Sequence, residues 1–313
     1  MTTFTHQTVL LDEAVVSVLG AQNGVYVDAT FGRGGHARHL LARLGETAQV
    51  FGFDKDLQAI GAGAALAAED PRFVIVHESF ADIQRVLATR GLSGQVDGVL
   101  ADLGVSSPQL DDAARGFSFQ NDGPLDMRMD VTRGESAAQW LAGVAEDELA
   151  RVLFEYGEER HSRRIARAIV KARTVNPITR TRELAEIVAA AHPAWEKHKH
   201  PATRSFQAIR IAINNELGDI ETFLRAALAV LKPGGRLAVI SFHSLEDRLV
   251  KQFFQKEARG DDFPRGLPVT VDMLKPRLKI IGKAIEPSAE EVDANPRSRS
   301  ARLRVAEKIA EAA

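Results

Sequence analysis

Two groups of residues in this chain have the types and spacing that ligand chemistry requires. Gly32, Gly34 and Ala37 match the pattern G-x-G-x-x-[G/A] directly after the apolar run 25–28. Glycine lets the backbone turn sharply and approach a ligand, and a helix that begins there presents free amide groups. Asp54 ends the next apolar run, where a carboxylate accepts hydrogen bonds from ribose hydroxyls. The pattern predicts a nucleotide-binding loop, and a plain tight turn is the alternative.

Asp28 favours one class of ligand over another. A carboxylate at the mouth of the glycine loop repels a pyrophosphate and attracts an ammonium or a sulfonium group. S-adenosylmethionine carries both cations and no phosphate. Asp28 therefore favours this cofactor over a nicotinamide dinucleotide.

Asp102 opens the second candidate site, the run 102–109 at the end of another apolar strand. Ligands of open α/β sheets bind at that carboxyl edge. The stretch Ser107-Pro-Gln-Leu110 partly resembles the Ser-Pro-Pro-aromatic signature of amino-group methyltransferases, in which acceptor groups hold an exocyclic amine. Gln109 and Leu110 depart from that signature. A Ser-Ser-Pro turn is the alternative interpretation.

Histidines offer one candidate base and no expected metal site. His243 follows the predicted fifth strand and could accept a proton there, while a cap of the next helix fits it equally well. No carboxylate or thiol completes a ligand set with His192, His198 and His200 at the usual spacing. We predict that these three lie in a solvent-facing basic loop and that the protein binds no metal.

Strands must position these groups, and their spacing predicts a mostly parallel sheet. Apolar runs predict strands at 25–28, 50–54, 73–77 and 96–102, with helices between them at 36–44, 57–68 and 80–90. Such alternation is typical of βαβ units. A fifth strand, 236–242, follows only after roughly 130 residues, far more than the roughly 30 of a βαβ unit. An inserted domain is therefore expected between the fourth and fifth strands.

The insert has helical patterns at 137–154, 161–173 and 181–191, which predict an all-α domain. We place it at 110–212, and the sheet domain at 1–109 and 213–313. The tail adds two predicted strands, 277–281 and 301–305, which could pair as an antiparallel edge hairpin across a polar loop. The expected fold is thus α/β with a seven-stranded sheet.

Composition narrows the functional classes. The chain has 313 residues, 45% of them hydrophobic, and no cysteine, which excludes disulfides, thiolate metal sites and a cysteine nucleophile. Its first twenty residues read as an amphipathic helix and not as a signal peptide, and no apolar run approaches the length of a membrane span. We expect a soluble globular protein without a membrane segment.

The net charge is only -2, but positive and negative residues are distributed unevenly along the chain. The segment 160–182 contains eight Lys or Arg and no acid, and its predicted helix repeats basic residues every four positions: Arg163, Arg167 and Lys171. A solvated helix face is the alternative. Two further basic regions, 197–210 and 297–304, favour RNA over a small acidic substrate.

The loop 117–130 contains two aromatic residues and Arg128. Phe117 and Phe119 could stack a base, in which case the loop would act as a lid. They could equally anchor the loop to the core. The sequence does not decide between these interpretations.

Five motifs together resemble the RsmH (MraW) family over nearly the whole chain. They are 6–13 (HQTVLLDE), 28–36 (DATFGRGGH), 102–109 (DLGVSSPQ), 205–210 (SFQAIR) and 241–247 (SFHSLED). The resemblance implies a class I, Rossmann-like methyltransferase with a helical insert that recognises the substrate. It also implies N4-methylation of a cytidine in the decoding region of small-subunit ribosomal RNA by a bacterial cytoplasmic enzyme.

Carried onto this sequence, the resemblance implies S-adenosylmethionine contacts at Gly34, Gly35, His36, Asp54, Phe80, Asp102 and Gln109. Local patterns add Asp28 and Gly32 to the cofactor site. Asp102, Ser107 and His243 are the catalytic candidates. The expected partner is small-subunit ribosomal RNA, preferably within the assembled subunit, and a homodimer is left open.

Two other classes of function compete with this expectation. An NAD-dependent oxidoreductase would fit the glycine pattern and Asp54, but Asp28 disfavours it. A non-catalytic RNA-binding factor would explain the basic regions. It would leave the acids at the strand ends without a role.

Overall fold

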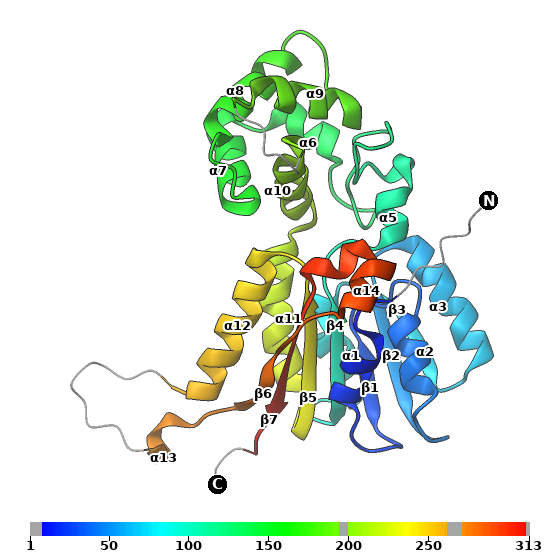
Figure 1. The fold of residues 1–313 in the computed structure, drawn as a ribbon. Coiled ribbons are helices and arrows are strands. Elements are labelled where there is room, and N and C mark those ends of the chain that lie inside the picture. Colours follow the sequence, from blue (N-terminus) through cyan, green and yellow to red (C-terminus); the bar gives the residue numbers. More distant parts are fainter. Residues whose placement is uncertain (1–7, 194–199, 262–270, 311–313) are drawn as a thin grey trace. The chain divides into compact units, whose positions relative to one another are not determined.

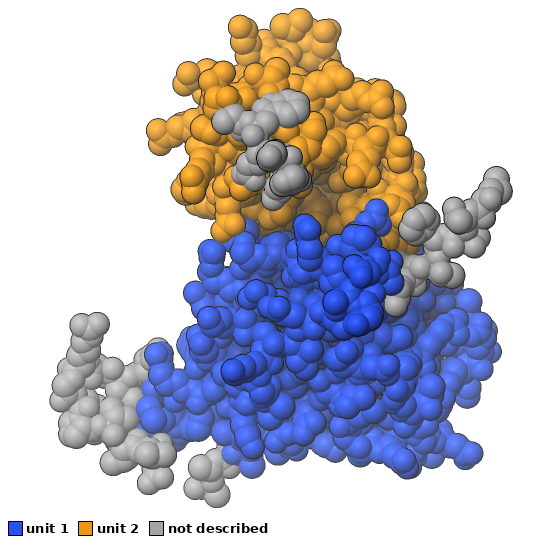
Figure 2. Space-filling model, in the orientation of Figure 1, with its two compact units in different colours: residues 1–104, 217–313 blue, residues 105–216 orange. Residues whose placement is uncertain are grey.

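The computed structural model describes residues 8–193, 200–261 and 271–310. The chain folds into two compact units (Figure 2). Unit 1 comprises residues 1–104 and 217–313, and unit 2 comprises residues 105–216. The expected insert, 110–212, lies within unit 2, which begins earlier and ends later along the chain.

Unit 1 is built on one seven-stranded sheet with the order β3-β2-β1-β4-β5-β7-β6 (Figure 1). Its strands are β1 (Val25–Asp28), β2 (Gln49–Asp54), β3 (Phe73–His77), β4 (Val96–Asp102), β5 (Leu231–Ser241), β6 (Leu278–Ile285) and β7 (Arg302–Lys308). The first five pair in parallel, and β7 runs antiparallel to both of its neighbours. The predicted mostly parallel, seven-stranded α/β sheet is confirmed. The tail strands do pair with each other, and β7 joins that pair to β5.

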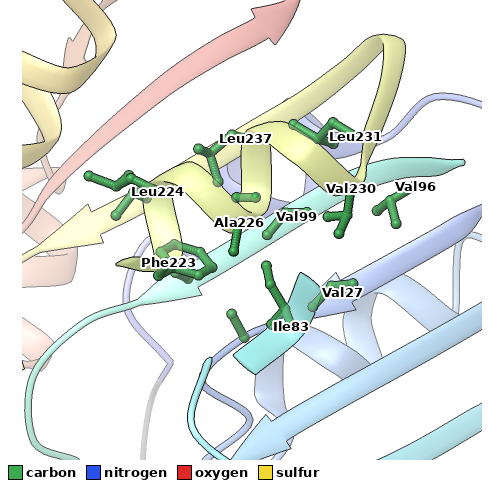
Figure 3. Close-up of a cluster of buried hydrophobic side chains, with 14 of the residues drawn as sticks. Val27, Ile83, Val96, Val99, Phe223, Leu224, Ala226, Val230, Leu231 and Leu237 are labelled. Atoms are coloured by element: carbon green, nitrogen blue, oxygen red, sulfur yellow. The ribbon is translucent and has the colours of Figure 1, made fainter. Parts of the chain in front are cut away.

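Both faces of this sheet are covered, because neighbouring residues on each strand enter different hydrophobic clusters. Val27 and Val99 belong to one cluster, whereas Tyr26 and Leu100 belong to the other. This alternation follows from the two-residue period of a strand. Helix α11 (Glu216–Val230) brings Phe223 and several aliphatic side chains to the first cluster (Figure 3). Burial on both faces is typical of parallel sheets.

The remaining helical segments of unit 1 are α1 (Leu11–Val18), α2 (Gly35–Leu41), α3 (Leu57–Glu69), η1 (Phe80–Asp82), α4 (Ile83–Ala88), α12 (Ser244–Arg259), α13 (Val271–Leu274), α14 (Ala289–Ala294) and η3 (Pro296–Ser300). Two expectations were wrong in detail. The helix predicted at 80–90 is a 3-10 turn followed by a short α-helix. The polar loop predicted between the tail strands contains α14, which begins because the Ser288 hydroxyl accepts the Glu291 N–H at 3.2 Å.

Unit 2 is helical and has its own core. It contains α5 (Ser107–Asp111), η2 (Ala113–Arg115), α6 (Ala137–Gly143), α7 (Glu146–Gly157), α8 (Ser162–Arg173), α9 (Thr181–Ala191) and α10 (Ala202–Asn214). The single helix predicted at 137–154 is two helices, because Val144 and Ala145 adopt extended ψ values of 137° and 148°. Helix α10 was not predicted as a helix, since its residues were read as part of a basic region and of the motif 205–210. Its apolar face, which includes Phe206 and Ile209, is buried in this core.

The described helices include none that is both long enough and apolar enough to cross a membrane.

Two glycine substitutions should change stability in opposite directions. A Cβ on Gly98 in β4 would lie 2.6 Å from the Val18 carbonyl oxygen, whereas a Cβ on Gly61 in α3 would meet nothing within 4 Å. We expect Gly98→Ala to lower the free energy of unfolding by about 1–3 kcal/mol through overpacking. Gly61→Ala should raise it by up to about 1 kcal/mol through helix propensity. Urea unfolding measures both, and equal stability of the two variants would contradict this packing account.

Candidate cofactor site

Three carboxylates end three adjacent parallel strands of unit 1. Asp28 ends β1, Asp54 ends β2 and Asp102 ends β4, and β1 lies between the other two strands. Because the strands are parallel, their carboxyl ends meet at one edge of the sheet, where open α/β folds bind ligands. The structure thus brings together the three acids that the sequence singled out.

The glycine loop leaves β1 at this edge and leads into α2. Gly32 and Gly34 have φ values of 56° and 80°, which disfavour residues with a side chain. Gly34 is further constrained because a Cβ there would lie 2.7 Å from the ring of Phe31. The loop is tied to β2, since the Gly32 N–H donates to Asp54 Oδ2 at 2.8 Å.

Asp54 therefore holds the loop as well as offering acceptors. Its other oxygen, Oδ1, accepts the Asp56 N–H at 2.9 Å. Burial raises the pKa of Asp54, and these backbone donors act against that shift. Each carboxylate oxygen has more than one acceptor position, so hydroxyl groups of a ligand can still bind.

The carboxyl groups of Asp28 and Asp102 have fewer of their hydrogen bonds satisfied than that of Asp54. Neither Asp28 Oδ2 nor Asp102 Oδ1 has a hydrogen-bond partner among the described residues, although both atoms are buried. Burial raises the pKa of Asp28 to about 7. The Thr30 N–H, which donates to this carboxylate, acts against the shift, and the negative charge of Asp54 adds to it. Burial and then the charge of Asp28 raise the pKa of Asp102 well above its ordinary value.

Buried polar atoms without partners are unusual in folded proteins and call for an explanation. A cationic ligand would supply one here, because an opposite charge favours the ionised carboxylate and offsets the cost of burial. The expectation from the sequence treated Asp28 as ionised. Its raised pKa qualifies that expectation, since the ligand itself must help to maintain the charge.

Thr30 links the two carboxylate-bearing strands and was missed in the sequence. Its N–H donates to Asp28 Oδ1 at 3.3 Å, and its hydroxyl accepts the Asp102 N–H at 2.6 Å. One residue thereby fixes the ends of both β1 and β4. A hydroxyl residue two positions after a strand-terminal acid was the available signal, because such residues often bond to nearby backbone.

Phe80 lies in η1, which follows β3 closely. Its ring packs edge to face against Phe223 with centroids 5.3 Å apart, and the Lys55 ammonium lies 5.8 Å from its centroid. Lys55 is itself paired with Asp219, which also accepts the Ser79 hydroxyl at 2.9 Å. Phe80 is only half-buried, so part of its aromatic surface is available to a ligand.

His36 is almost fully buried, and its side chain contacts the N-terminal segment. Its Nε2 lies 3.2 Å from the carbonyl oxygen of Val9. His36 follows Gly34 and Gly35 at the start of α2, where backbone N–H groups have no partner within the helix. A ligand contact through the backbone and a structural contact through the ring are therefore compatible.

Ser107 and Gln109 belong to unit 2, in which they form the first turn of α5. The Gln109 side chain accepts the Ser106 N–H at 2.9 Å and forms a capping box with Ser106. These residues therefore begin a short capped helix, where the alternative from the sequence was a Ser-Ser-Pro turn. The roles of Ser107 and Gln109 in catalysis and cofactor binding stay predictions.

His243 has the geometry of a helix cap. Its Nδ1 accepts the Glu246 N–H at 3.5 Å, and the Glu246 carboxylate accepts the N–H groups of Phe242 and His243 at 2.8 and 3.2 Å. Nε2 of His243 lies 3.0 Å from Glu246 Oε1. The capping alternative is thus realised, and a catalytic role stays a prediction.

The histidines of unit 2 do not form one solvent-facing loop. The side chain of His192 is only 10% exposed, and its ring packs edge to face against His161 at 4.9 Å. Its Nε2 lies 3.6 Å from Glu159 Oε1. The expectation was therefore wrong for His192. His200 is exposed and lies 4.6 Å from the ring of Phe119, whereas His198 lies outside the described residues.

The loop 117–130 is anchored through Phe117, which is 5% exposed and part of the unit 2 core. The Arg115 guanidinium lies 5.6 Å from its ring centroid. Phe119 is half-buried between His200 and Phe206, with centroids 4.6 and 4.8 Å away. Anchoring thus describes Phe117, and the stacking of a base by Phe117 and Phe119 stays a prediction.

Of the three basic regions, α8 keeps an exposed cationic face. Arg163, Arg164, Arg167 and Lys171 are exposed, while Ile165 and Ile169 are buried on the opposite side. The region 297–304 was overestimated as a phosphate site. Arg304 forms two hydrogen bonds to Asp247 at 2.7 and 3.0 Å, and Arg302 pairs with Glu286 at 3.2 Å.

In the region 197–210, Arg210 is held by Glu216 at 2.8 Å. Lys197 and Lys199 lie outside the described residues. Among the described residues of this segment, Arg210 is thus engaged by an acid, which lowers the positive charge that it offers to phosphates.

Comparison with known proteins gives a family match over almost the full length. Residues 3–309 match the MraW methylase family. An rRNA methylase from Streptococcus thermophilus is 12% identical, with 95% of this chain and 93% of that chain covered and a TM-score of 0.40. TrmN from Thermus thermophilus is 15% identical over 96% and 48% of the two chains, with a TM-score of 0.43.

Fibrillarin from Aeropyrum pernix, solved with natively bound S-adenosyl-L-methionine, is 9% identical over 94% and 72% of the two chains, with a TM-score of 0.38. Values this low do not identify a function. The family match carries the assignment.

Burial of Asp28 predicts a pH-dependent stability. Its folded pKa of about 7 exceeds the ordinary 3.8, so the folded state binds the proton more tightly and loses stability as pH rises from about 4 to about 7. An asparagine side chain at this position would carry no charge at any pH. Asp28→Asn should therefore stabilise the cofactor-free protein at pH 8, by on the order of a few kcal/mol, and much less at pH 4.5. Urea unfolding at both pH values measures this, and a pH-independent difference would contradict it.

Proposed function

Because this chain belongs to the MraW methylase family, we propose that it methylates N4 of a cytidine in the decoding region of small-subunit ribosomal RNA. Family membership makes it an S-adenosylmethionine-dependent methyltransferase. The RNA, the base and the acceptor atom are the proposed part.

The observation that best supports a cationic cofactor is the pair of buried carboxyl oxygens without partners, Asp28 Oδ2 and Asp102 Oδ1. Both lie at the edge from which the glycine loop departs. The pyrophosphate of NAD would add negative charge to a region that already holds three carboxylates. An ammonium or a sulfonium would instead relieve their repulsion.

The site residues expected from the sequence are proposed to bind S-adenosylmethionine group by group. We assign the backbone at Gly34, Gly35 and His36 to its methionine end, Asp54 to its ribose and Phe80 to its adenine. Asp102 faces its cationic part, and Gln109 is carried over from the family resemblance. When bound, the cofactor supplies an electrophilic methyl group.

Positioning would supply most of the rate. The exocyclic amine of cytosine is a weak nucleophile, because its lone pair is delocalised into the ring. The protein therefore has to hold the base out of its stack with the amine in line with the methyl group. Acceptors in the run 102–109, including Ser107, would fix the amine and direct its lone pair.

One proton must leave as the new N–C bond forms. The amine becomes acidic only once it carries the methyl group, so a strong base is not required. Asp102 is the preferred acceptor, because it ends β4 at the ligand-binding edge of the sheet and burial raises the pKa of its carboxyl group, which makes its carboxylate a stronger base than that of an ordinary aspartate. His243 is the second candidate, at the end of β5.

We assign substrate recognition to unit 2. The exposed cations of α8 belong to a segment with eight Lys or Arg and no acid, and such a surface attracts the phosphates of RNA. The substrate would be reached in the cytoplasm, where ribosomal subunits are assembled. We favour the assembled small subunit over free RNA.

Ribosomal RNA from cells that lack this protein tests the function directly. Mass spectrometry should find one methyl group missing, on N4 of one decoding-region cytidine, and the wild-type gene should restore it. Asp102→Ala should lower the initial methylation rate by at least about a hundredfold, as expected for a lost acid–base group. Gly61→Ala serves as the matched control. A missing methyl on another atom, or full activity of Asp102→Ala, would refute the corresponding assignment.

The α8 surface generates a separate prediction. No ion pair is described for Arg163, Arg164 or Lys171 within the part of the chain that the structure covers, so their charges are available to phosphates. Replacing all three by Gln should weaken RNA binding and lower the slope of log Kd against log salt by about 2, at about 0.7 per phosphate contact. Filter binding at several salt concentrations measures this.

Arg151 provides the control for this variant, because its guanidinium is engaged by Glu148 and Glu155 at 2.6 and 2.5 Å. Arg151→Gln should leave both the RNA affinity and the salt slope nearly unchanged. Cofactor affinity should be unaffected in both proteins. A loss per removed charge that is as large for Arg151→Gln as for the triple variant would show that total charge, and not the α8 face, governs binding.

A further inference from the structure

The segment Thr8-Val9-Leu10 has no part in the function proposed above, although it belongs to one of the five motifs quoted from the sequence. It precedes α1 in unit 1. Each of its three residues makes a separate contact with the cofactor site or with an element beside it. These contacts connect residues 8–10 to the glycine loop and to α14.

Thr8 packs directly on the glycine loop. A Cβ placed on Gly35 would lie 1.9 Å from Thr8 Oγ1 and 3.0 Å from Thr8 Cβ. Gly35 does not have a positive φ, so its backbone would accept alanine. The side chain of Thr8 is therefore what restricts position 35 to glycine.

Val9 is joined to the next residue of the loop. Its carbonyl oxygen lies 3.2 Å from Nε2 of His36, and the two residues are 7% and 4% exposed. A carbonyl oxygen only accepts hydrogen bonds, so this contact requires the proton on Nε2 of the imidazole. The ring is thus fixed in both orientation and tautomer.

Leu10 connects the segment to helix α14. Its N–H donates to Glu291 Oε1 of α14 at 2.8 Å. Its φ of 47° is unusual for a leucine, and its side chain is 1% exposed within a core cluster. Such a conformation persists only where surrounding contacts impose it. Glu291 is also one of the charges that raise the pKa of Asp102.

We propose that residues 8–10 form a positioning clamp for the cofactor loop. Thr8 blocks outward movement of Gly35, the Val9 carbonyl holds the His36 ring, and Glu291 anchors the clamp beside the acid site. Backbone N–H groups of the loop are then held in place before the cofactor arrives. The inference rests on the proposed cofactor contacts at residues 34–36.

Preorganisation of this kind increases affinity, because a loop that is already ordered loses less entropy on binding. A segment that served only to complete the core would affect stability and leave cofactor affinity intact. The two roles therefore differ in a measurable way. The difference is clearest at a temperature well below unfolding.

A double-mutant cycle between positions 8 and 35 tests the clamp. Gly35→Ala should weaken S-adenosylmethionine binding by about tenfold or more, because the added methyl displaces Thr8 or the loop. Thr8→Gly alone should weaken it by a smaller factor. The double variant should bind more tightly than Gly35→Ala, since the space that Thr8 filled is now free. Calorimetric titration of the full-length protein gives all four affinities.

Gly61→Ala is the matched control for adding a methyl group, and it should bind like the wild type. If Thr8→Gly fails to recover any affinity in the Gly35→Ala background, the methyl group obstructs the cofactor itself and the clamp is refuted. The titration contains no RNA. Its outcome is therefore independent of which base or RNA the enzyme methylates.

The histidine contact gives a second test that does not depend on glycine packing. Glutamine can place an N–H near the position of Nε2, whereas alanine cannot. His36→Ala should lower both cofactor affinity and the hydrogen-exchange protection of the Leu10 amide, and His36→Gln should restore much of both. Loss of Leu10 protection without any loss of affinity would overturn the proposal.

Discussion

The burial of carboxylates at one edge of the sheet is the constraint on which the site depends. Asp28, Asp54 and Asp102 end neighbouring parallel strands, and burial raises the pKa of each. Three charges of one sign cannot be held in a poorly solvated region unless they are protonated, hydrogen-bonded or matched by a cation. The glycine loop and Thr30 donate hydrogen bonds to these carboxylates, and the proposed cofactor would supply the cation.

The three carboxylates at this edge differ in how fully the protein satisfies their hydrogen bonds. Asp54 is satisfied by the backbone N–H groups of Gly32 and Asp56, and it fixes the loop to β2. Asp28 and Asp102 each retain a buried oxygen without a partner among residues 8–193, 200–261 and 271–310. Native structures satisfy most buried polar atoms, and exceptions cluster at functional sites. The proposed cationic ligand would contact Asp28 and Asp102, whereas Asp54 both fixes the loop and keeps acceptor positions for the proposed ribose contact.

The second unit contributes a different physical property, because some of its cationic side chains are not paired with acidic side chains among the described residues. Many cations of the chain are neutralised locally, as Arg304 is by Asp247 and Arg151 by Glu148 and Glu155. On the exposed face of α8, Arg167 pairs with Glu146 at 3.5 Å, whereas no ion pair is described for Arg163, Arg164 or Lys171 among the residues that the structure covers. A polyanion gains most from charges that no neighbouring acid has already satisfied.

The sequence alone determined the features that depend on local pattern. The carboxyl ends of the first four strands, the glycine loop, the helical insert and the acids at residues 28, 54 and 102 follow from periodicity and from glycine geometry, whereas β5, β6 and β7 have other bounds than predicted. Tertiary structure decided what depends on contacts between distant residues. It set the strand order, gave His243 a capping geometry, paired Arg304 with Asp247 and laid Thr8 on Gly35. A sequence records which groups can interact, whereas burial and distance decide which of them do, because both arise only when remote segments pack together.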